Sequence, residues 1–351
     1  MHELEIDLDG VTAMHDVFFR MIKRFARQML LGSGALRWAA RFREKAAAIL
    51  MYHSVVEEPN QFSDTLGGIT HSRKTFQAQM ELLARDFEPV NLPRICEFLQ
   101  GGRELPVRAV AITFDDGYAD NYEVAMPILN RLGIPAAFYV TVDCIESRKL
   151  PWPSRLRFSF HQTSRNQFTD SSGQTWGLKD AAQREQAYLK ICDQICTFSG
   201  SALEEAVSEI ERSLDCKLAK ETGNLMMTWE QAKRLAQNGH ILGSHTMTHP
   251  NLAFLNSQEA YLEMFESKRV IEESIGGTIE HFSYPCPALF PNWTEQTLEE
   301  SRRLGYKTAV TTTDGLTHVK DNPLALKRVR PTKTVEGLRW NLESAFAGRG
   351  V

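Results

Sequence analysis

AVAITFDDGY, residues 109–118, is the stretch of the chain that decides the fold. Its first six residues are apolar or β-branched, which is typical of a buried strand in a parallel sheet. The run ends in two adjacent carboxylates, Asp115 and Asp116, followed by Gly117. Charge at a strand end is unfavourable unless a partner compensates it, and α/β folds bind ligands at the carboxyl ends of their strands. The stretch therefore predicts a functional site at this strand end. There the two aspartates either bind a cation or have pKa values that differ from each other.

Further strands are expected on both sides of this stretch, and most are separated by helical patterns. The alternation of strand and helix predicts a parallel sheet, either open or closed. The expected strands lie at residues 46–52, 87–92, 135–141, 241–244, 281–284, 307–312 and 324–329.

Two segments depart from the alternation. Residues 1–46 form a predicted basic amphipathic helical arm, which would either lie on an anionic membrane surface or pack on the rest of the protein. The domain at 47–351 has a mostly helical insertion at about 146–225, with helices expected at 181–198 and from Ser201, where Ser201 and Glu204 have capping-box spacing. The insertion follows a strand, so it either covers a substrate groove or is a structural addition.

The composition of the chain favours some classes of protein and argues against others. The 351 residues are 42% hydrophobic and 24% charged, as in soluble globular proteins. A net charge of −4 and the lack of any nucleic-acid-binding motif predict that no nucleic acid is bound. Because the sequence begins with acidic residues, we expect no signal peptide. Because it contains no long apolar run, we expect no transmembrane helix. We therefore expect a cytoplasmic protein with six reduced cysteines, at most peripheral to the inner face of the membrane.

A second strand end carries two histidines. His245 and His249 follow the strand predicted at 241–244, and their spacing is similar to that of the metalloprotease motif, except that Thr246 stands where the glutamate would be. Pro250 and the preceding strand indicate a loop rather than the middle of a helix. Two histidines and one carboxylate make a metal site with open positions. A non-haem iron oxygenase would also use this set, but it would leave the second aspartate without a role.

Together these motifs resemble those of the NodB-type polysaccharide deacetylases, carbohydrate esterase family 4. The resemblance is carried by TFDDG at 113–117 and SHTMTHP at 244–250, and it covers about 49–141 and 226–331. The motif YHSV at 52–55 is similar to that of the branch of the family that acts in exopolysaccharide and surface-glycan biosynthesis. The resemblance implies a distorted (β/α)₇ barrel, consistent with the number of predicted strands.

The resemblance also implies different roles for the two aspartates. Asp116, His245 and His249 would hold a divalent metal, expected to be zinc, with Co²⁺, Ni²⁺ and Mn²⁺ as alternatives. A bound metal lowers the pKa of its water from about 15.7 to about 7, and Asp115 would take the proton as that water attacks an N-acetyl carbonyl. Alternatively, Asp115 is the partner of a metal-bound histidine.

The third motif departs from the family pattern. Members have Tyr-Pro-Tyr-Gly or Arg-x-Pro-Tyr where this chain has Tyr284, Pro285, Cys286 and Pro287. Tyr284, Pro285 and Cys286 are expected at the substrate, with the Cys286 N–H donating to the oxyanion. Cys286 supplies no aromatic wall, and Pro287 fixes φ and removes the next donor. We therefore expect a pocket of altered shape.

Two further roles have several candidates. The arginine that steadies the base in the family would be replaced by Arg328 or Arg330 at the end of the last predicted strand, unless these are ordinary exposed charges. The general acid would be His53, which follows the first strand, or alternatively His318, because imidazole has a suitable pKa for protonating an amine. Either histidine is otherwise an ordinary loop residue.

The predicted function is metal-dependent removal of N-acetyl groups from an amino sugar of a glycan or of a lipid-linked glycan precursor. The expected partners are an N-acetylated saccharide and, through the basic arm, the membrane surface. Two alternatives stay open. The altered third motif would also suit a glycan-binding homologue with impaired turnover, and the insertion would suit a metallohydrolase acting on non-peptide C–N bonds of a small molecule.

Overall fold

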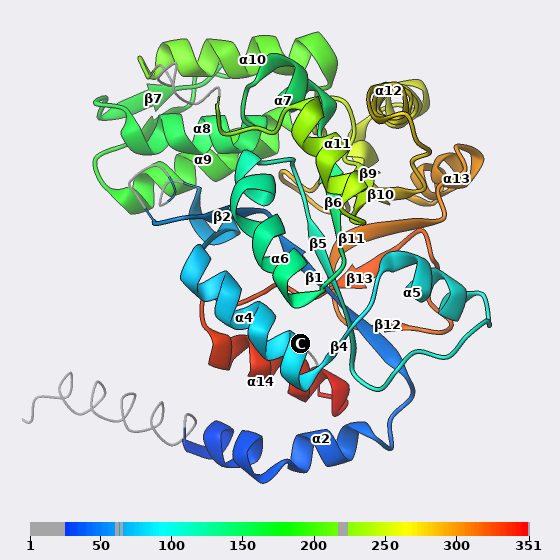
Figure 1. The fold of residues 1–351 in the computed structure, drawn as a ribbon. Helices are drawn as coiled ribbons and strands as arrows, with labels where there is room; N and C mark the ends of the chain where they lie inside the picture. Colours follow the sequence, from blue (N-terminus) through cyan, green and yellow to red (C-terminus); the bar gives the residue numbers. More distant parts are fainter. Residues whose placement is uncertain (1–24, 60–62, 64–65, 217–223, 350–351) are drawn as a thin grey trace, which may run out of the picture.

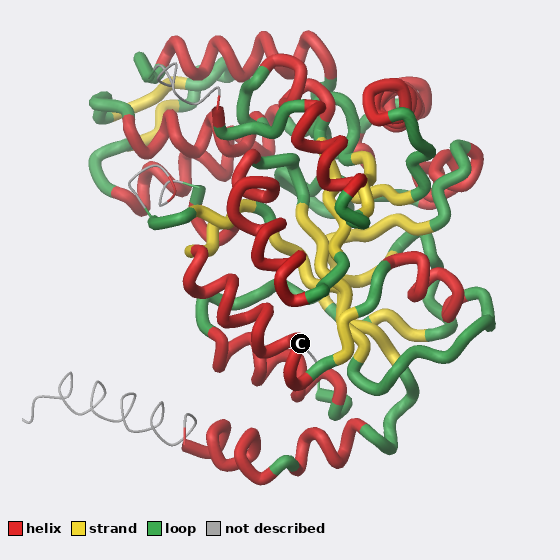
Figure 2. Tube along the Cα trace, viewed as in Figure 1, coloured by secondary structure: helices red, strands yellow, loops and turns green. Residues whose placement is uncertain are grey.

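A computed structural model of the protein describes residues 25–59, 63, 66–216 and 224–349. A central barrel of strands is surrounded by helices (Figure 1). A helical lobe lies beyond one end of the barrel, and the first described helices lie at the opposite end (Figures 1 and 2).

Seven parallel strands form the barrel within the described residues: β1 (Ala46–Tyr52), β5 (Ala109–Phe114), β6 (Ala136–Val140), β9 (Ile241–Ser244), β10 (His281–Ser283), β11 (Thr308–Asp314) and β13 (Leu326–Arg328). Neighbouring strands pair in this order. A parallel bridge between Leu50 and Val329 then returns the last strand to the first. The nearly closed barrel confirms the predicted fold, and it places all seven carboxyl ends at the same end.

The remaining strands are short. They are β2 (Ser54–Val56) and β3 (Thr70–Ser72), which pair with each other, β4 (Glu88–Pro89) beside β5, and β12 (Thr317–His318), which is antiparallel to β1. The strand expected at 87–92 is thus reduced to two residues, because Asn91 caps a helix that begins at Leu92.

Successive side chains of the barrel strands pack into two different cores. Ala109 and Ala111 of β5 share one apolar cluster with Tyr139, whereas Val110 and Ile112 belong to the cluster that includes the surrounding helices. This period of two is what a barrel requires of strands with an inner and an outer face. The inner series of β5 continues through residue 113 to residue 115, so the first aspartate points into the mouth of the barrel.

Helices cover the sides of the barrel: α4 (Arg73–Asp86), α5 (Leu92–Leu99), α6 (Met126–Leu132) after a π-helical turn (Asn121–Ala125), α7 (Val142–Ser147), α11 (Trp229–Gln237), α12 (Ser257–Ile275), α13 (Glu295–Arg303) and α14 (Val335–Phe346), with 3-10 turns at Gly67–Ile69 and Leu252–Phe254. Thr228, Asn256 and Thr294 begin α11, α12 and α13 with capping boxes. These caps fix where each helix starts after the loops at the carboxyl ends of the strands.

The lobe beyond the carboxyl ends is built from α8 (Trp152–Gln162), α9 (Ala181–Ile195), α10 (Gly200–Ser213) and the hairpin of β7 (Gln167–Thr169) and β8 (Thr175–Gly177). It has its own apolar core, separate from that of the barrel. The sequence analysis did not predict α8, which begins between two prolines, a residue type that is tolerated in the first turn of a helix. The capping box predicted at Ser201 was wrong. The helix begins one residue earlier, and Glu204 instead pairs with Arg155 and Lys149.

The described part of the basic arm packs on α14. Residues 25–33 are helical and are followed by α2 (Ala35–Ala40). Leu31 and Leu36 form a small apolar cluster with Ala347, and Arg37 pairs with Glu343 at 3.2 Å. The basic residues predicted at 20–24 lie outside the described residues. Among those described, the helices are all too short or too polar to cross a bilayer.

Candidate functional site

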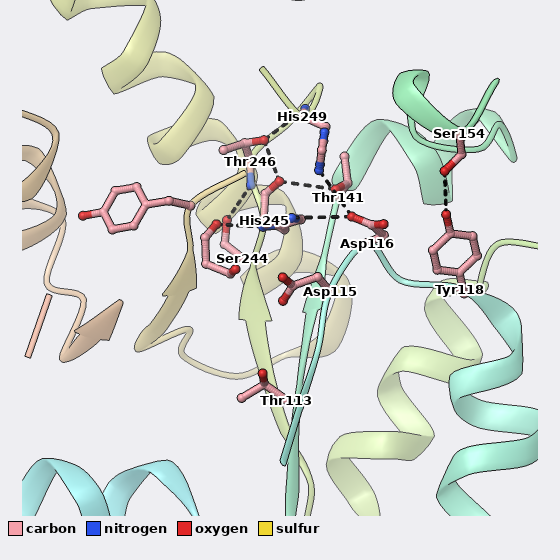
Figure 3. A network of polar contacts seen from close by, with 12 residues as sticks. Thr113, Asp115, Asp116, Tyr118, Thr141, Ser154, Ser244, His245, Thr246 and His249 are labelled. Atoms are coloured by element: carbon pink, nitrogen blue, oxygen red, sulfur yellow. Dashed lines mark hydrogen bonds and ion pairs between the residues drawn. The ribbon is translucent and has the colours of Figure 1, made fainter. Parts of the chain in front are cut away.

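The two aspartates and the two histidines meet at the carboxyl end of the barrel. β5 and β9 lie on either side of β6 in the sheet, and side chains from the turns that follow β5 and β9 point toward one another (Figure 3). Asp116 and His249 both have left-handed backbone, with φ of 74° and 63°. This conformation is unfavourable for residues other than glycine and occurs most often at functional sites. After Asp116 the chain turns at Gly117, whose φ of 89° suits glycine alone.

Three of these side chains form a compact buried cluster. Asp116 Oδ1 lies 3.3 Å from His249 Nε2 and 3.5 Å from His245 Nε2, and all three residues are buried. Asp116 Oδ1 has no hydrogen-bond partner among the described residues. A buried carboxylate oxygen facing two imidazole nitrogens without a hydrogen bond fits a divalent metal, because three protein ligands leave open positions for water or substrate.

The orientation of His245 is fixed by a bond from its other ring nitrogen. His245 Nδ1 lies 2.7 Å from the backbone oxygen of Ser283 at the end of β10. A carbonyl oxygen only accepts, so Nδ1 carries the hydrogen and Nε2, which faces Asp116, is the ring nitrogen that can bind a metal. Second partners of this kind are how proteins set the tautomer of metal-binding histidines.

The loop between the histidines is held by a buried carboxylate that the sequence analysis missed. Glu263 of α12 accepts from the N–H groups of Met247 and Thr248, both at 2.9 Å, and from the Thr248 hydroxyl at 2.5 Å. A signal was present, since Glu263 lies on the buried face of α12 with Ala260 and Ser267. A carboxylate on such a face indicates specific partners.

Asp115 is held by an arginine at the mouth of the barrel. Arg328, which is 1% exposed, donates from two guanidinium nitrogens to the two carboxylate oxygens at 2.9 and 2.7 Å. It also donates to the Thr311 backbone oxygen at 2.7 Å. Of the two predicted arginines, Arg328 is therefore the one that steadies Asp115. Arg330 lies at the pocket, where it approaches Asp314 at 3.9 Å.

The charged groups around Asp115 and Asp116 favour the ionised form of both aspartates. Burial raises the pKa of Asp115, but Arg328 and His245 outweigh burial and hold the pKa below its usual value. Burial likewise raises the pKa of Asp116, but the two imidazoles hold it well below its usual value. Burial lowers the pKa of His245, whereas Asp115 and Asp116 raise it further than burial lowers it. Both carboxylates are therefore available at neutral pH as a ligand and as a base.

A pocket of about 580 Å³ opens over the cluster. His53 lines it together with both aspartates, as predicted from its position after the first strand. Burial lowers the pKa of His53, although Asp116 and Asp115 oppose this effect. The resting imidazole is therefore neutral. The insertion contributes Tyr188 and Leu189 to the wall, so it does cover the site, one of the two roles left open by the sequence.

His318 does not join the site. It lies on β12, where it pairs with Ala46 at the amino end of β1. The cluster lies at the carboxyl end of the same strand, so this candidate for the general acid was wrong.

The third motif is only partly at the pocket. Tyr284, Cys286 and Pro287 line it, although the ring of Tyr284 is buried and its hydroxyl bonds to Ser301 at 2.8 Å. Pro285 lies between them and is not among the described residues that line the pocket. The expected substrate contact of Tyr284 is thus not made by its hydroxyl, which belongs to the core.

Comparisons with known sequences agree with the motifs. Residues 102–194 and 198–309, more than half of the chain, match the family model described as polysaccharide deacetylase. YxkH of Bacillus subtilis (strain 168) is 23% identical over 301 residues, which are 86% of this chain and 76% of that protein. The poly-β-1,6-N-acetyl-D-glucosamine N-deacetylase of Escherichia coli (strain K12) is 32% identical over 82 residues, which are 23% of this chain and 12% of that protein.

Solved structures show the same fold. The Streptococcus pyogenes deacetylase PplD, in complex with acetate, superposes with a TM-score of 0.57 at 19% identity, covering 84% of this chain and 97% of that chain. IcaB from Ammonifex degensii superposes with a TM-score of 0.55 at 19% identity, covering 86% of this chain and 99% of that chain. With the family model spanning both motif-bearing halves of the barrel, the chain belongs to the polysaccharide deacetylase family.

Proposed function

We propose that this protein removes the acetyl group from an N-acetylated amino sugar of a glycan by metal-dependent hydrolysis. The observation that carries the proposal is a buried Asp116, His245 and His249 cluster beside the arginine-paired Asp115, at the floor of one pocket. Membership of the family supports this chemistry. The E. coli relative, named for N-acetyl-D-glucosamine polymers, supports the substrate class.

Asp116 Oδ1 and the Nε2 atoms of His245 and His249 would hold the metal. Zinc is the proposed ion because three protein ligands of nitrogen and oxygen type are characteristic of catalytic zinc sites. When bound, a divalent metal supplies a Lewis acid and a water molecule of lowered pKa.

The protein's own residues would handle the protons. Asp115, kept ionised by Arg328, would accept a proton from the attacking water. The Cys286 N–H would donate to the acetyl oxygen as negative charge develops there. The amide C–N bond breaks as the new C–O bond forms, which releases acetate and an amine. His53 would pass a proton to that amine. Because its resting ring is neutral, His53 would first have to take up a proton, and the proton that Asp115 accepts from the water balances the one delivered to the amine.

The direct test is acetate release from N-acetylglucosamine oligosaccharides. The zinc-loaded protein should release acetate, and chelation should abolish release until Zn²⁺ is added back. His245→Ala should reduce release to the level of the chelated protein, because it removes a metal ligand. His318→Ala is the matched control, since His318 lies at the other end of β1, and it should leave the rate unchanged. Stoichiometric zinc and sugar binding without acetate would instead support the glycan-binding alternative.

We also propose that the basic arm contacts an anionic membrane surface. In the arm, Phe25, Met29, Trp38 and Phe42 are 60–72% exposed, and the Trp38 and Phe42 rings meet edge to face at 4.8 Å. Exposed arginines, including Arg41, lie among them. Aromatic side chains next to basic ones are typical of helices that lie in a membrane interface.

Vesicle co-sedimentation tests this contact. The protein should bind vesicles with about 30% anionic lipid more tightly than neutral vesicles, and Arg41→Gln should weaken binding about five-fold. Trp38→Ala with Phe42→Ala should weaken it further. Phe198→Ala, which removes an exposed phenylalanine of the lobe, should have no effect. Equal binding to both vesicle types, or a change of oligomeric state in the Trp38→Ala, Phe42→Ala protein, would contradict the proposal.

A further inference from the structure

His249 differs from His245 in what holds its ring. His245 is oriented through its Nδ1 by the backbone oxygen of Ser283. The Nδ1 atom of His249 is buried and has no hydrogen-bond partner among the described residues. The direction of the His249 ring therefore depends on its backbone, whose φ of 63° is unfavourable for a histidine. Such a conformation costs about 1–3 kcal/mol and persists only where the surroundings impose it.

Two contacts impose this backbone conformation. The N–H of His249 donates to the Thr246 hydroxyl at 3.0 Å, a bond within the loop itself (Figure 3). The carbonyl oxygen of His249 accepts from Trp152 Nε1 at 2.9 Å. The second bond comes from outside the barrel, because Trp152 is the first residue of α8 in the helical lobe.

Trp152 is well placed to act as a fixed donor. It is 4% exposed and packs in the core of the lobe with Leu156. Pro151 and Pro153 flank it, and proline fixes the backbone φ on both sides of the indole. Because the indole is packed in this core, its N–H is held toward the His249 carbonyl.

The lobe also reaches the turn of the other ligand. Two residues along α8, Ser154 Oγ lies 2.8 Å from the hydroxyl of Tyr118, which follows Asp116 and Gly117 (Figure 3). From α10, the Gly200 N–H donates to the Thr248 hydroxyl at 3.3 Å. The lobe thus touches both of the turns that carry the proposed metal ligands.

From this geometry we infer that the helical lobe is a scaffold for the metal site, in which Trp152 is a positioning residue for His249. The inference rests on the proposed function, because it assumes that Asp116, His245 and His249 hold the metal. It gives the 146–225 insertion a role beyond lining the pocket.

Trp152→Phe removes the N–H but keeps a large aromatic ring. We expect the affinity for Zn²⁺, measured by competition with a chromophoric chelator, to fall about 10–100-fold, the usual effect of removing a partner that orients a metal ligand. The far-UV circular dichroism should stay unchanged. Trp152→3-benzothienylalanine, which has the shape of tryptophan without its N–H, should show the same loss and covers the case in which the phenylalanine variant does not fold.

Trp229→Phe is the matched control. Trp229 also donates its indole N–H to a protein oxygen, that of Glu146 at 2.5 Å, and neither residue is among the described residues that line the pocket. This variant should bind Zn²⁺ as the unmodified protein does. Zinc affinity of the Trp152 variants within two-fold of the unmodified protein, or an equal loss in Trp229→Phe, would overturn the inference. Failure of the unmodified protein to bind Zn²⁺ would instead refute the proposed function.

Discussion

Asp115→Asn is expected to lower kcat for acetate release by about 10²–10⁴-fold, the usual contribution of a general base. Asparagine cannot take a proton from water, although it keeps one oxygen that accepts from Arg328. The proposed metal ligands include Asp116 and not Asp115, so the affinity for Zn²⁺ should change little. Loss of turnover with retention of the metal is the result that separates a base from a ligand.

The measurement is steady-state acetate release normalised to bound zinc. The variant also weakens a buried ion pair, and this normalisation leaves out any protein that unfolds during the assay. Asp116→Asn provides the contrast, since it should lose zinc and turnover together. A kcat for Asp115→Asn within ten-fold of the unmodified enzyme would show that Asp115 only orients a neighbour, which is the alternative left open by its sequence.

The sequence was sufficient to find the cluster because each half of it is local. Asp115 and Asp116 directly follow one apolar run, and His245 and His249 follow another. Parallel strands bring their carboxyl ends to one edge, so the two motifs could be placed together without coordinates. The likeness to a known family then separated the roles of the two aspartates.

The partners of these residues could not be found in the same way. Choosing Arg328 over Arg330 requires knowing that β13 ends at Arg328, because residues two apart in a strand would otherwise point to the same face. His318 can be excluded as the general acid only once β12 is known to pair antiparallel with β1, because this pairing places His318 at the amino end of β1. Trp152 contacts His249 across 97 positions of the chain, and no local pattern predicts so distant a contact. Such contacts depend on how the lobe sits on the barrel.

Arg328→Met is expected to lower the free energy of unfolding by about 3–5 kcal/mol at neutral pH, the usual effect of removing one partner of a buried ion pair. Methionine fills much of the space but leaves the Asp115 carboxylate buried without the two N–H groups that the Arg328 guanidinium donates to it. It also leaves the Thr311 oxygen without the guanidinium N–H. Urea denaturation followed by circular dichroism measures the loss. Arg330→Met, at an exposed arginine two residues away, should change the free energy of unfolding by less than about 1 kcal/mol.

The effect should depend on pH in a defined direction. Burial raises the pKa of Asp115, but Arg328 and His245 outweigh it, so the pKa lies below its usual value. Such a group stabilises the fold above its unfolded pKa of about 3.9, and this stability is lost as the pH falls through the lowered value. When Arg328 is removed, less charge opposes the effect of burial, so the pKa of Asp115 rises. The difference in unfolding free energy between the two proteins should therefore narrow as the pH falls from about 7, and it should go on narrowing below about pH 3.9, where Asp115 of the unmodified protein becomes protonated.

Combining Arg328→Met with Asp115→Asn separates the ion pair from the rest of the pocket. Each single variant leaves one buried charge without its partner, whereas the double variant removes both charges. The double variant should therefore be more stable than the sum of the two single losses predicts, by about 0.5–3 kcal/mol, the range found for residues in contact. Its turnover should stay as low as that of Asp115→Asn, because the base is still absent. Strict additivity of the two stability losses would show that Arg328 and Asp115 act independently and would refute the pairing as the source of the charge on the base.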